Sequence, residues 1–168
     1  MKLSVLRHGI AAELGDDGSQ VDSERKLTRE GREKLKCVAA ALCEMGISFD
    51  LILSSPYARA RQTAELIAAS LKCEKRLKFS NLLEPGSTFE ALIREINRLS
   101  KLDDSILLVG HEPFLSKLIS RLLTGNDEAC ITLKKGGFCF LDVQKLRDGR
   151  CAVLECLMAP RHMCCGAK

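Results

Sequence analysis

The amino-acid sequence predicts an α/β fold, a three-layer α/β/α sandwich with a mostly parallel central sheet. Short apolar runs of strand length alternate with longer segments in which apolar residues recur at helical spacing. Residues 105–109 form the most apolar run, as expected for a strand that helices cover on both faces. Because no linker or internal repeat breaks this alternation, we expect one domain over residues 1–160 and a C-terminal tail over residues 161–168.

The first expected strand, residues 3–6, leads directly into Arg7, His8 and Gly9. A strand that runs into a charged pair and a glycine is typical of a central strand whose carboxyl end opens onto a site. The glycine would let the backbone approach a ligand closely. Residues 13–26 are polar and show no apolar periodicity, so we expect them to form a loop over this end of the strand.

A helix is expected next, with Thr28 as its N-cap and Gly46 at its end, because apolar residues between them share one helical face. The second strand covers residues 49–53. Two serines and Pro56 follow it, and proline suits the first turn of a helix, so a second helix should begin there. We assign the serines to capping of that helix, because they lack the glycine-flanked context of a serine nucleophile.

The middle of the chain contains an expected edge strand at residues 76–79 and a loop at residues 81–86 that is rich in turn-forming residues. Ser87 and Glu90 have the spacing of a capping box. They therefore predict the start of a third helix.

The apolar strand at residues 105–109 ends just before His111, and Pro113 stands where a fourth helix can begin. Beyond that helix the pattern changes to two strands, residues 132–143 and 151–158, joined by an Arg-Asp-Gly turn. We expect these two strands to form an antiparallel hairpin at one edge of the sheet.

Composition restricts the classes of function. Of 168 residues, 46% are hydrophobic and 29% charged, as in ordinary globular domains, and the net charge is +4. The basic residues are dispersed without interleaved aromatic residues, so nucleic-acid binding is not predicted. No apolar run approaches the roughly 18 residues of a membrane span, and Arg7 and His8 interrupt any signal-peptide core, so a cytoplasmic protein without membrane association is expected.

The nine cysteines do not form a metal or disulfide framework in the sequence. No two of them form a C-x-x-C pair, and their scatter through apolar segments predicts reduced thiols that pack as small hydrophobic residues. His162, Cys164 and Cys165 resemble a ligand cluster, but two adjacent cysteines do not readily share one tetrahedral metal ion. A flexible tail without a metal site is expected there.

Three expected strands end in polar residues above the same edge of the sheet. Arg7 and His8 follow the first strand, Arg59 lies one turn into the helix after the second, and His111 follows the third. In an open α/β sheet, ligands bind at the carboxyl ends of neighbouring strands. Two histidines and two arginines that meet there would bind a dianion, since guanidinium groups pair with phosphate oxygens.

The polar strand ends belong to three sequence motifs. They are Leu6-Arg7-His8-Gly9, Ser55-Pro56-Tyr57-Ala58-Arg59-Ala60-Arg61-Gln62-Thr63 and Val109-Gly110-His111. Together, and in this order, they resemble the motifs of the histidine phosphatase superfamily, which includes the phosphoglycerate mutases. Within it the chain is similar to the short SixA-type phosphohistidine phosphatases, which share its compact length and its Leu27-Thr28-Arg29-Glu30-Gly31 sequence.

The resemblance implies that His8 is the nucleophile and that Arg7, Arg59 and His111 bind the phosphoryl group, with no metal or other cofactor. The chemistry of these side chains is compatible with those roles. A histidine near its ordinary pKa is partly neutral at pH 7 and attacks phosphorus, while arginines and a protonated His111 spread the negative charge.

The general acid is less well defined. Relatives that act on phosphate monoesters use a carboxylate from the loop after the third strand, and Glu84 is the nearest candidate here. Glu90 and Glu112 are alternatives, although capping for Glu90 and solvation for Glu112 are the preferred interpretations. If the substrate is phosphohistidine, the acid matters less, because an imidazole leaving group is already protonated near neutral pH.

The expected function is that of a phosphatase that forms a phosphohistidine intermediate and dephosphorylates phosphohistidine in a protein partner such as a phosphotransfer domain. The first alternative is a phosphatase for a small phosphorylated metabolite or nucleotide. A phosphoglycerate mutase-type transferase is disfavoured by the short chain. A non-catalytic phospho-binding module is disfavoured because all four pocket residues are present.

Overall fold

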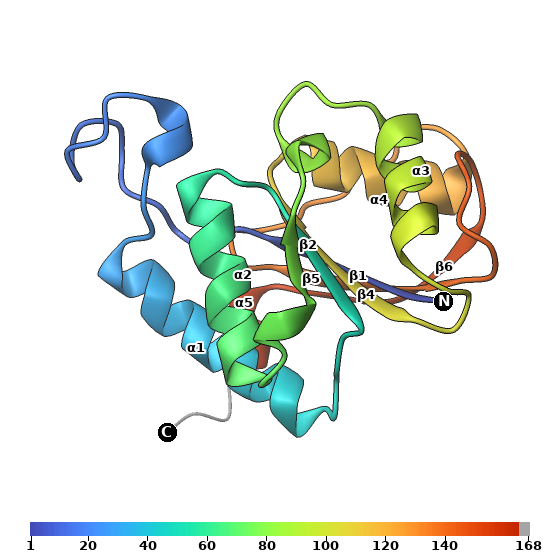
Figure 1. Cartoon of the computed structure of the whole chain (residues 1–168), viewed down its shortest axis with the longest axis horizontal. Coiled ribbons are helices and arrows are strands. Elements are labelled where there is room, and N and C mark those ends of the chain that lie inside the picture. Colours follow the sequence, from blue (N-terminus) through green and yellow to red (C-terminus); the bar gives the residue numbers. More distant parts are fainter. Residues whose placement is uncertain (165–168) are drawn as a thin grey trace.

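The computed structural model describes residues 1–164 as a six-stranded sheet with helices on both faces (Figure 1). The strands are β1 (Lys2–Arg7), β2 (Leu51–Ser54), β3 (Leu77–Phe79), β4 (Ser105–Gly110), β5 (Phe138–Val143) and β6 (Ala152–Met158). The helices are α1 (Arg29–Glu44), α2 (Ala58–Ser70), α3 (Phe89–Leu99), α4 (Phe114–Thr124) and α5 (Pro160–Met163). Short 3₁₀ turns lie at Asp22–Glu24, Glu74–Arg76 and Asn81–Leu83.

The strand order across the sheet is β3-β2-β4-β1-β5-β6. Strands β1 to β4 pair in parallel, whereas β5 pairs antiparallel with both β1 and β6. The predicted fold class, a mostly parallel sheet between helices, is therefore confirmed. The antiparallel hairpin and the strand β3 form the two edges, as the sequence predicts.

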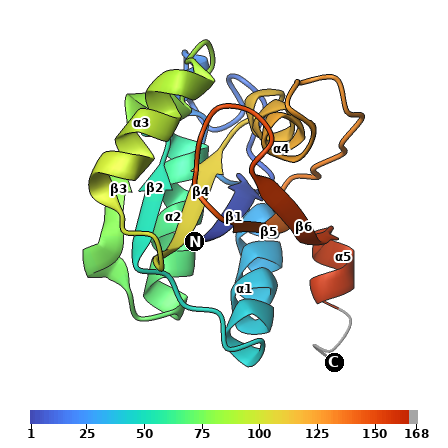
Figure 2. The same ribbon diagram turned by 90° about the vertical axis from the view of Figure 1, so that its right-hand side faces the viewer.

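Two apolar clusters cover the two faces of the sheet. Successive residues of β4 alternate between them: Leu107 belongs to the cluster that contains residues of α1 and α2, and Leu108 to the cluster that contains residues of α3 and α4. Both leucines are fully buried, which explains why this strand reads as a continuous apolar run. Figure 2 shows α4 above the sheet and α1 below it. Within the described part of the chain, no helix is long and apolar enough to cross a membrane.

The observed starts of the helices agree only partly with those predicted from the sequence. Thr28 caps α1 as predicted, because its hydroxyl accepts a hydrogen bond from the Gly31 amide at 3.0 Å. For α3 the predicted capping box is wrong: Thr88 is the N-cap. The helix α2 begins two residues after Pro56, so this proline precedes the first turn instead of lying in it.

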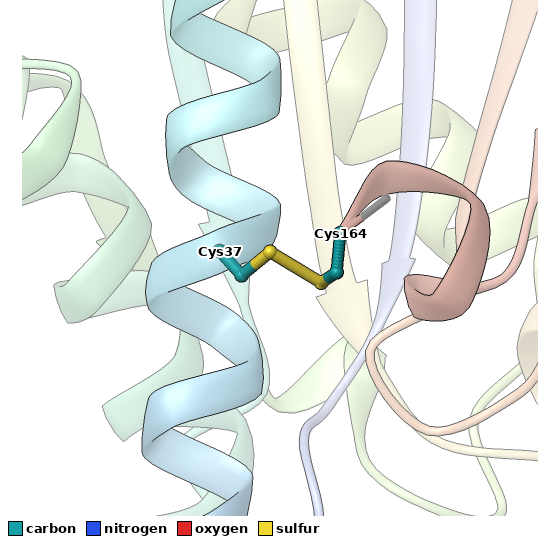
Figure 3. Close-up of a disulfide and its surroundings, with 2 residues drawn as sticks. All are labelled: Cys37 and Cys164. Carbon is teal, nitrogen blue, oxygen red and sulfur yellow. A yellow bond between two sulfur atoms is a disulfide. The ribbon is translucent and has the colours of Figure 1, made fainter. Parts of the chain in front are cut away.

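The first residues of the predicted tail are part of the fold. Helix α5 packs against α1, and Met163 is buried in the same apolar cluster as α1 and α2. A disulfide joins Cys37 on α1 to Cys164, with 5.6 Å between their Cα atoms (Figure 3). The expectation of reduced thiols is therefore wrong for Cys37 and Cys164, because burial of α5 brings two cysteines far apart in the sequence together. Residues 165–168 lie outside the described residues.

Candidate active site

The carboxyl ends of three neighbouring strands meet at one edge of the sheet, as predicted. Arg7, at the end of β1, is paired in register with Gly110 at the end of β4. The His8 amide donates to the Gly110 carbonyl at 3.1 Å, and the Ser55 amide, after β2, donates to the Val109 carbonyl at 2.9 Å. Parallel pairing therefore places the residues that follow these strands side by side.

His8 is buried at this edge, with 6% of its surface exposed. Its Nδ1 lies 2.7 Å from the Gly9 carbonyl oxygen. Because a carbonyl only accepts hydrogen bonds, Nδ1 carries the proton, and the lone pair of the neutral ring is on Nε2. The arrangement leaves Nε2 as the nitrogen that can attack an electrophile.

Burial lowers the pKa of His8 to about 3, although the hydrogen bond to Gly9 acts in the opposite direction. The nearby side chains of His111, Arg59 and Arg7 lower this pKa further. The ring is therefore neutral at pH 7, more completely than the ordinary histidine pKa assumed from the sequence implies.

Gly9 allows close packing of a helix. A Cβ at this position would lie 2.6 Å from Cδ1 of Leu35 on α1. The expected close approach of a ligand to the Gly9 backbone stays a prediction. The Gly9 amide donates to the hydroxyl of Thr63 on α2 at 3.1 Å. Thr63 in turn donates to the Arg59 carbonyl at 2.7 Å, which ties α2 to the backbone at His8.

His111 lies next to His8, with 5.1 Å between the centres of the two rings. Its Nε2 is 2.9 Å from the hydroxyl of Ser55, and its Nδ1 is buried without a hydrogen-bond partner among the described residues. Burial lowers the pKa of His111 to about 4, and Arg59 lowers it as well, while Asp22 opposes this shift. His111 is therefore neutral at pH 7 in the protein without a bound phosphoryl group, and its expected protonation during phosphoryl transfer stays a prediction.

We infer that the Ser55 hydroxyl donates to Nε2 of His111. The Tyr57 amide donates to this hydroxyl at 3.3 Å, and the hydroxyl proton is available for Nε2, which lies 2.9 Å away. In this arrangement the proton of the neutral ring lies on Nδ1. His111 can then donate from Nδ1 to a phosphoryl oxygen without being charged.

Replacement of this serine tests the assignment. We expect Ser55→Ala to lower kcat by roughly tenfold to a hundredfold, the usual effect of losing a residue that orients a catalytic ring, with less change in KM. Ser54→Ala is the matched control, because Ser54 is equally buried but bonds to the Ser55 carbonyl instead of to His111. Nitrogen NMR shifts of the His111 ring report the tautomer, and an unchanged tautomer in Ser55→Ala would contradict the assignment.

Arg59 is fixed by the loop that the sequence places over the site. Its Nη1 donates to the Asp22 carbonyl at 2.6 Å and its Nη2 to the Asp22 carboxylate at 2.8 Å. Burial raises the pKa of Asp22, but hydrogen bonds from Arg25 and Arg59 outweigh it and keep this pKa below its ordinary value. A charged carboxylate therefore holds the buried guanidinium in place beside the two histidines.

Arg7 approaches the site from β1. Its Nη1 donates to the Leu133 carbonyl at 2.9 Å, whereas its Nε is buried and has no partner among the described residues. Burial lowers the pKa of Arg7 and Glu112 raises it, but a guanidinium remains protonated near neutral pH. The structure thus brings together all four residues predicted for the phosphoryl site.

The three candidate acids lie in different surroundings. Glu84 is half-buried and lines a hollow of ≈ 690 Å³ together with Tyr57 and residues of the loop before α1. Glu90 forms an ion pair with Arg121 at 3.5 Å, and Glu112 accepts from the Ser116 amide at 3.0 Å, which caps α4. The predicted capping by Glu90 and free solvation of Glu112 are both wrong. Glu112 lines a hollow of ≈ 250 Å³ together with His111, whereas Glu84 shares its larger hollow with Asp17 and Glu24. The assignment of Glu84 as the acid stays a prediction.

Sequence reasoning missed two residues of the site, Asp22 and Ser55. Nothing in the sequence around Asp22 predicts that it pairs with Arg59, which lies 37 residues later in the chain. Ser55 was assigned to helix capping, and it does accept from Tyr57, but its contact with His111 arises only from the pairing of β2 with β4.

The pKa shifts of the two histidines predict a pH dependence. In the unfolded chain a histidine titrates near 6.5, whereas in the folded protein the pKa values are about 3 for His8 and about 4 for His111. Their contribution to the free energy of unfolding is therefore complete above pH 6.5 and is lost as the pH falls toward these folded values. An NMR titration should show no inflection for either ring between pH 8 and about 5.5, and a midpoint near 6.5 would contradict the burial argument.

Comparison with known proteins adds a family and a fold. The family model of the histidine phosphatase superfamily (branch 1) matches residues 3–84. An uncharacterised protein of Picosynechococcus sp. is 37% identical over 138 residues, which are 82% of each chain.

Two solved phosphatase structures have the same fold. One is the protein histidine phosphatase SixA complexed with tungstate, with a TM-score of 0.84, 22% identity and coverage of 97% of this chain and 99% of the other. The other is a putative α-ribazole-5′-P phosphatase from Escherichia coli, with a TM-score of 0.69, 24% identity and coverage of 95% and 98%. At these identities the two matches show a shared fold.

Proposed function

Because the chain belongs to the histidine phosphatase superfamily, we propose that it transfers a phosphoryl group to Nε2 of His8 and that its substrate is a phosphohistidine in a protein. One observation carries the proposal: His8 is neutral, its Nδ1 bonds to the Gly9 carbonyl, and Nε2 is left to attack beside His111.

In the first step Nε2 of His8 attacks phosphorus, a P–N bond forms to His8, and the bond from phosphorus to the leaving group breaks. The guanidinium groups of Arg7 and Arg59 and the Nδ1 proton of His111 would stabilise the charge on the phosphoryl oxygens. Water then attacks the phosphohistidine, which releases phosphate and returns His8 to its neutral form. Because arginines neutralise the charge, the steps require no metal ion.

Two features favour phosphohistidine in a protein over a monoester. A protonated imidazole leaves without further help, so hydrolysis of phosphohistidine does not depend on a carboxylate that acts as general acid. The loop before α1 and Glu84, which follows the 3₁₀ turn Asn81–Leu83, line a hollow of ≈ 690 Å³, and Tyr57 in this lining has its ring centre 5.2 Å from that of His111. A phosphorylated side chain that projects from a folded protein can reach such a site.

A small phosphorylated metabolite is the second candidate. The hollow of ≈ 690 Å³ beside Tyr57 is large enough for a sugar phosphate or a nucleotide, and a solved structure of the same fold is named as an α-ribazole-5′-P phosphatase. A panel of a phosphohistidine protein, an aryl phosphate and sugar phosphates separates the candidates. The proposal expects the highest kcat/KM for the phosphohistidine protein, and a strong preference for a metabolite would overturn it.

Glu84→Gln tests how the leaving group is protonated. We expect this substitution to slow aryl phosphate hydrolysis by roughly 10²-fold or more, the usual contribution of a general acid, and to slow phosphohistidine hydrolysis much less. Glu90→Gln is the matched control, because the Glu90 carboxylate pairs with Arg121 on the surface. Equal loss on both substrates would show that Glu84 does not act as the acid.

A further inference from the structure

A second hollow, of ≈ 600 Å³, lies next to Arg7 on the side of the sheet that carries α5. Five of its lining residues are basic and four are small or apolar: Arg7, Lys34, Lys134, Lys135 and Arg161, with Ile10, Ala159, Pro160 and Cys164. Among the described residues, its lining contains no aspartate or glutamate. The hollow therefore combines an apolar floor with a positively charged rim.

The rim of this hollow is attached directly to the backbone at the nucleophile. The Gly136 amide donates to the carbonyls of both Arg7 and His8, at 3.1 and 3.0 Å. Lys134 and Lys135 stand directly before Gly136 in the sequence, and both are exposed. Two basic side chains are therefore held beside the site by a fixed turn, not by a free loop.

The opposite wall is also fixed. A Cβ at Gly136 would lie 3.2 Å from the Pro160 ring, so the turn packs closely against α5. The disulfide between Cys37 and Cys164 joins the end of α5 to α1 (Figure 3). The hollow is thus preformed between α1, α5 and the turn before β5, which limits the ordering cost of binding.

The hollow beside Tyr57 and the hollow beside Arg7 differ in charge. The one beside Tyr57 is lined by three carboxylates, Asp17, Glu24 and Glu84, and by two basic residues. The hollow beside Arg7 is lined by basic residues alone among its charged groups in the described chain. A protein substrate that presents its phosphohistidine to His8 therefore meets positive potential on one side only, and acidic groups on its surface are attracted to that side.

We propose that this basic hollow docks an acidic surface of the phosphoprotein substrate next to its phosphohistidine. The inference rests on the proposed function and adds the substrate class: phosphohistidine flanked by carboxylates. Long exposed lysines on a rigid turn suit several dispersed carboxylates of a protein surface better than one compact anion. Lys34 already pairs with Glu30 at 2.6 Å, so Lys134 and Lys135 are the residues whose charge is decisive.

The test compares two synthetic peptides of equal length that carry phosphohistidine flanked by glutamates or by glutamines. At low ionic strength the wild-type protein should show a kcat/KM about tenfold higher for the glutamate peptide, within the range of electrostatic steering. In the double variant Lys134→Gln/Lys135→Gln this ratio should fall to about one, and added salt should lower it in the wild type. Lys75→Gln/Lys78→Gln is the control, because it removes the same charge from exposed positions near β3, at the far edge of the sheet, and should leave the ratio unchanged.

The other outcomes are distinct. A ratio of about one in the wild type, or an unchanged ratio in Lys134→Gln/Lys135→Gln, would overturn the docking proposal while phosphohistidine turnover itself continued. An equal loss on both peptides in that variant would assign the lysines to the phosphoryl group and would also overturn it. If the wild type hydrolysed an aryl phosphate but neither peptide, the proposed function would have failed, not only the docking surface.

Discussion

His8→Ala is expected to lower kcat/KM by on the order of 10⁴-fold or more, on a phosphohistidine protein and on an aryl phosphate alike. The substitution removes Nε2, the one atom to which the phosphoryl group is transferred, and no neighbouring side chain offers an equivalent. His111 does not replace it, because in the inferred arrangement the Ser55 hydroxyl donates to its Nε2 and its Nδ1 carries the proton. Steady-state kinetics with both substrates measures the loss.

Two further measurements make this result specific. Circular dichroism and the Tm of His8→Ala should show an intact fold, since within residues 1–164 the ring hydrogen-bonds only to the adjacent Gly9. Rapid quenching of the wild type with labelled substrate should trap an adduct on His8 that is labile in acid and stable in base, as expected of phosphohistidine. Substantial turnover in a folded His8→Ala would reject His8 as the nucleophile.

Arg59→Ala is expected to lower kcat by about 10²–10³-fold, the typical effect of losing one preorganised donor to a charged transition state. Asp22 holds the guanidinium by two hydrogen bonds, so its geometry is set before the substrate binds. Arg59→Lys should restore only part of the activity, because an ammonium group keeps the charge but loses the planar fork. Kinetics at saturating substrate separates the effect on kcat from that on KM.

Arg98→Ala is the control for this experiment. Arg98 is an exposed residue of α3, away from the carboxyl ends of the strands, and its loss should change kcat less than twofold to threefold, as is usual for exposed residues. If Arg59→Ala and Arg98→Ala had similar activity, Arg59 would have no part in charge stabilisation. A rise in KM with unchanged kcat would limit Arg59 to ground-state binding.

Much of the fold could be read from local patterns. The apolar run at residues 105–109 predicted a central strand, and Leu107 and Leu108 do face opposite apolar clusters. The alternation of the remaining strands and helices, with the change of pattern after α4, predicted the parallel sheet and its antiparallel edge. These features depend on residues that are close together in the sequence. The spacing of apolar residues indicates which face of each helix or strand is buried.

Local patterns were less reliable at helix starts and at the C-terminus. Ser87 and Thr88 both suit an N-cap, and only the path of the chain into α3 selects Thr88. The disulfide between Cys37 and Cys164 joins residues with a sequence separation of 127, and no local spacing of cysteines predicts it. Such choices depend on which surfaces the fold brings into contact.

The sequence by itself determined that Arg7, His8, Arg59 and His111 gather at one edge of the sheet, because each lies at or just after the carboxyl end of a parallel strand. Only the tertiary structure decided their chemical state. Burial lowers the pKa of both histidines, Ser55 contacts Nε2 of His111, and Asp22 orients Arg59. The physical reason is that the positions of the strands along the chain follow from local hydrophobic pattern, whereas desolvation and hydrogen bonding depend on groups that are distant in the sequence and meet only in the folded chain.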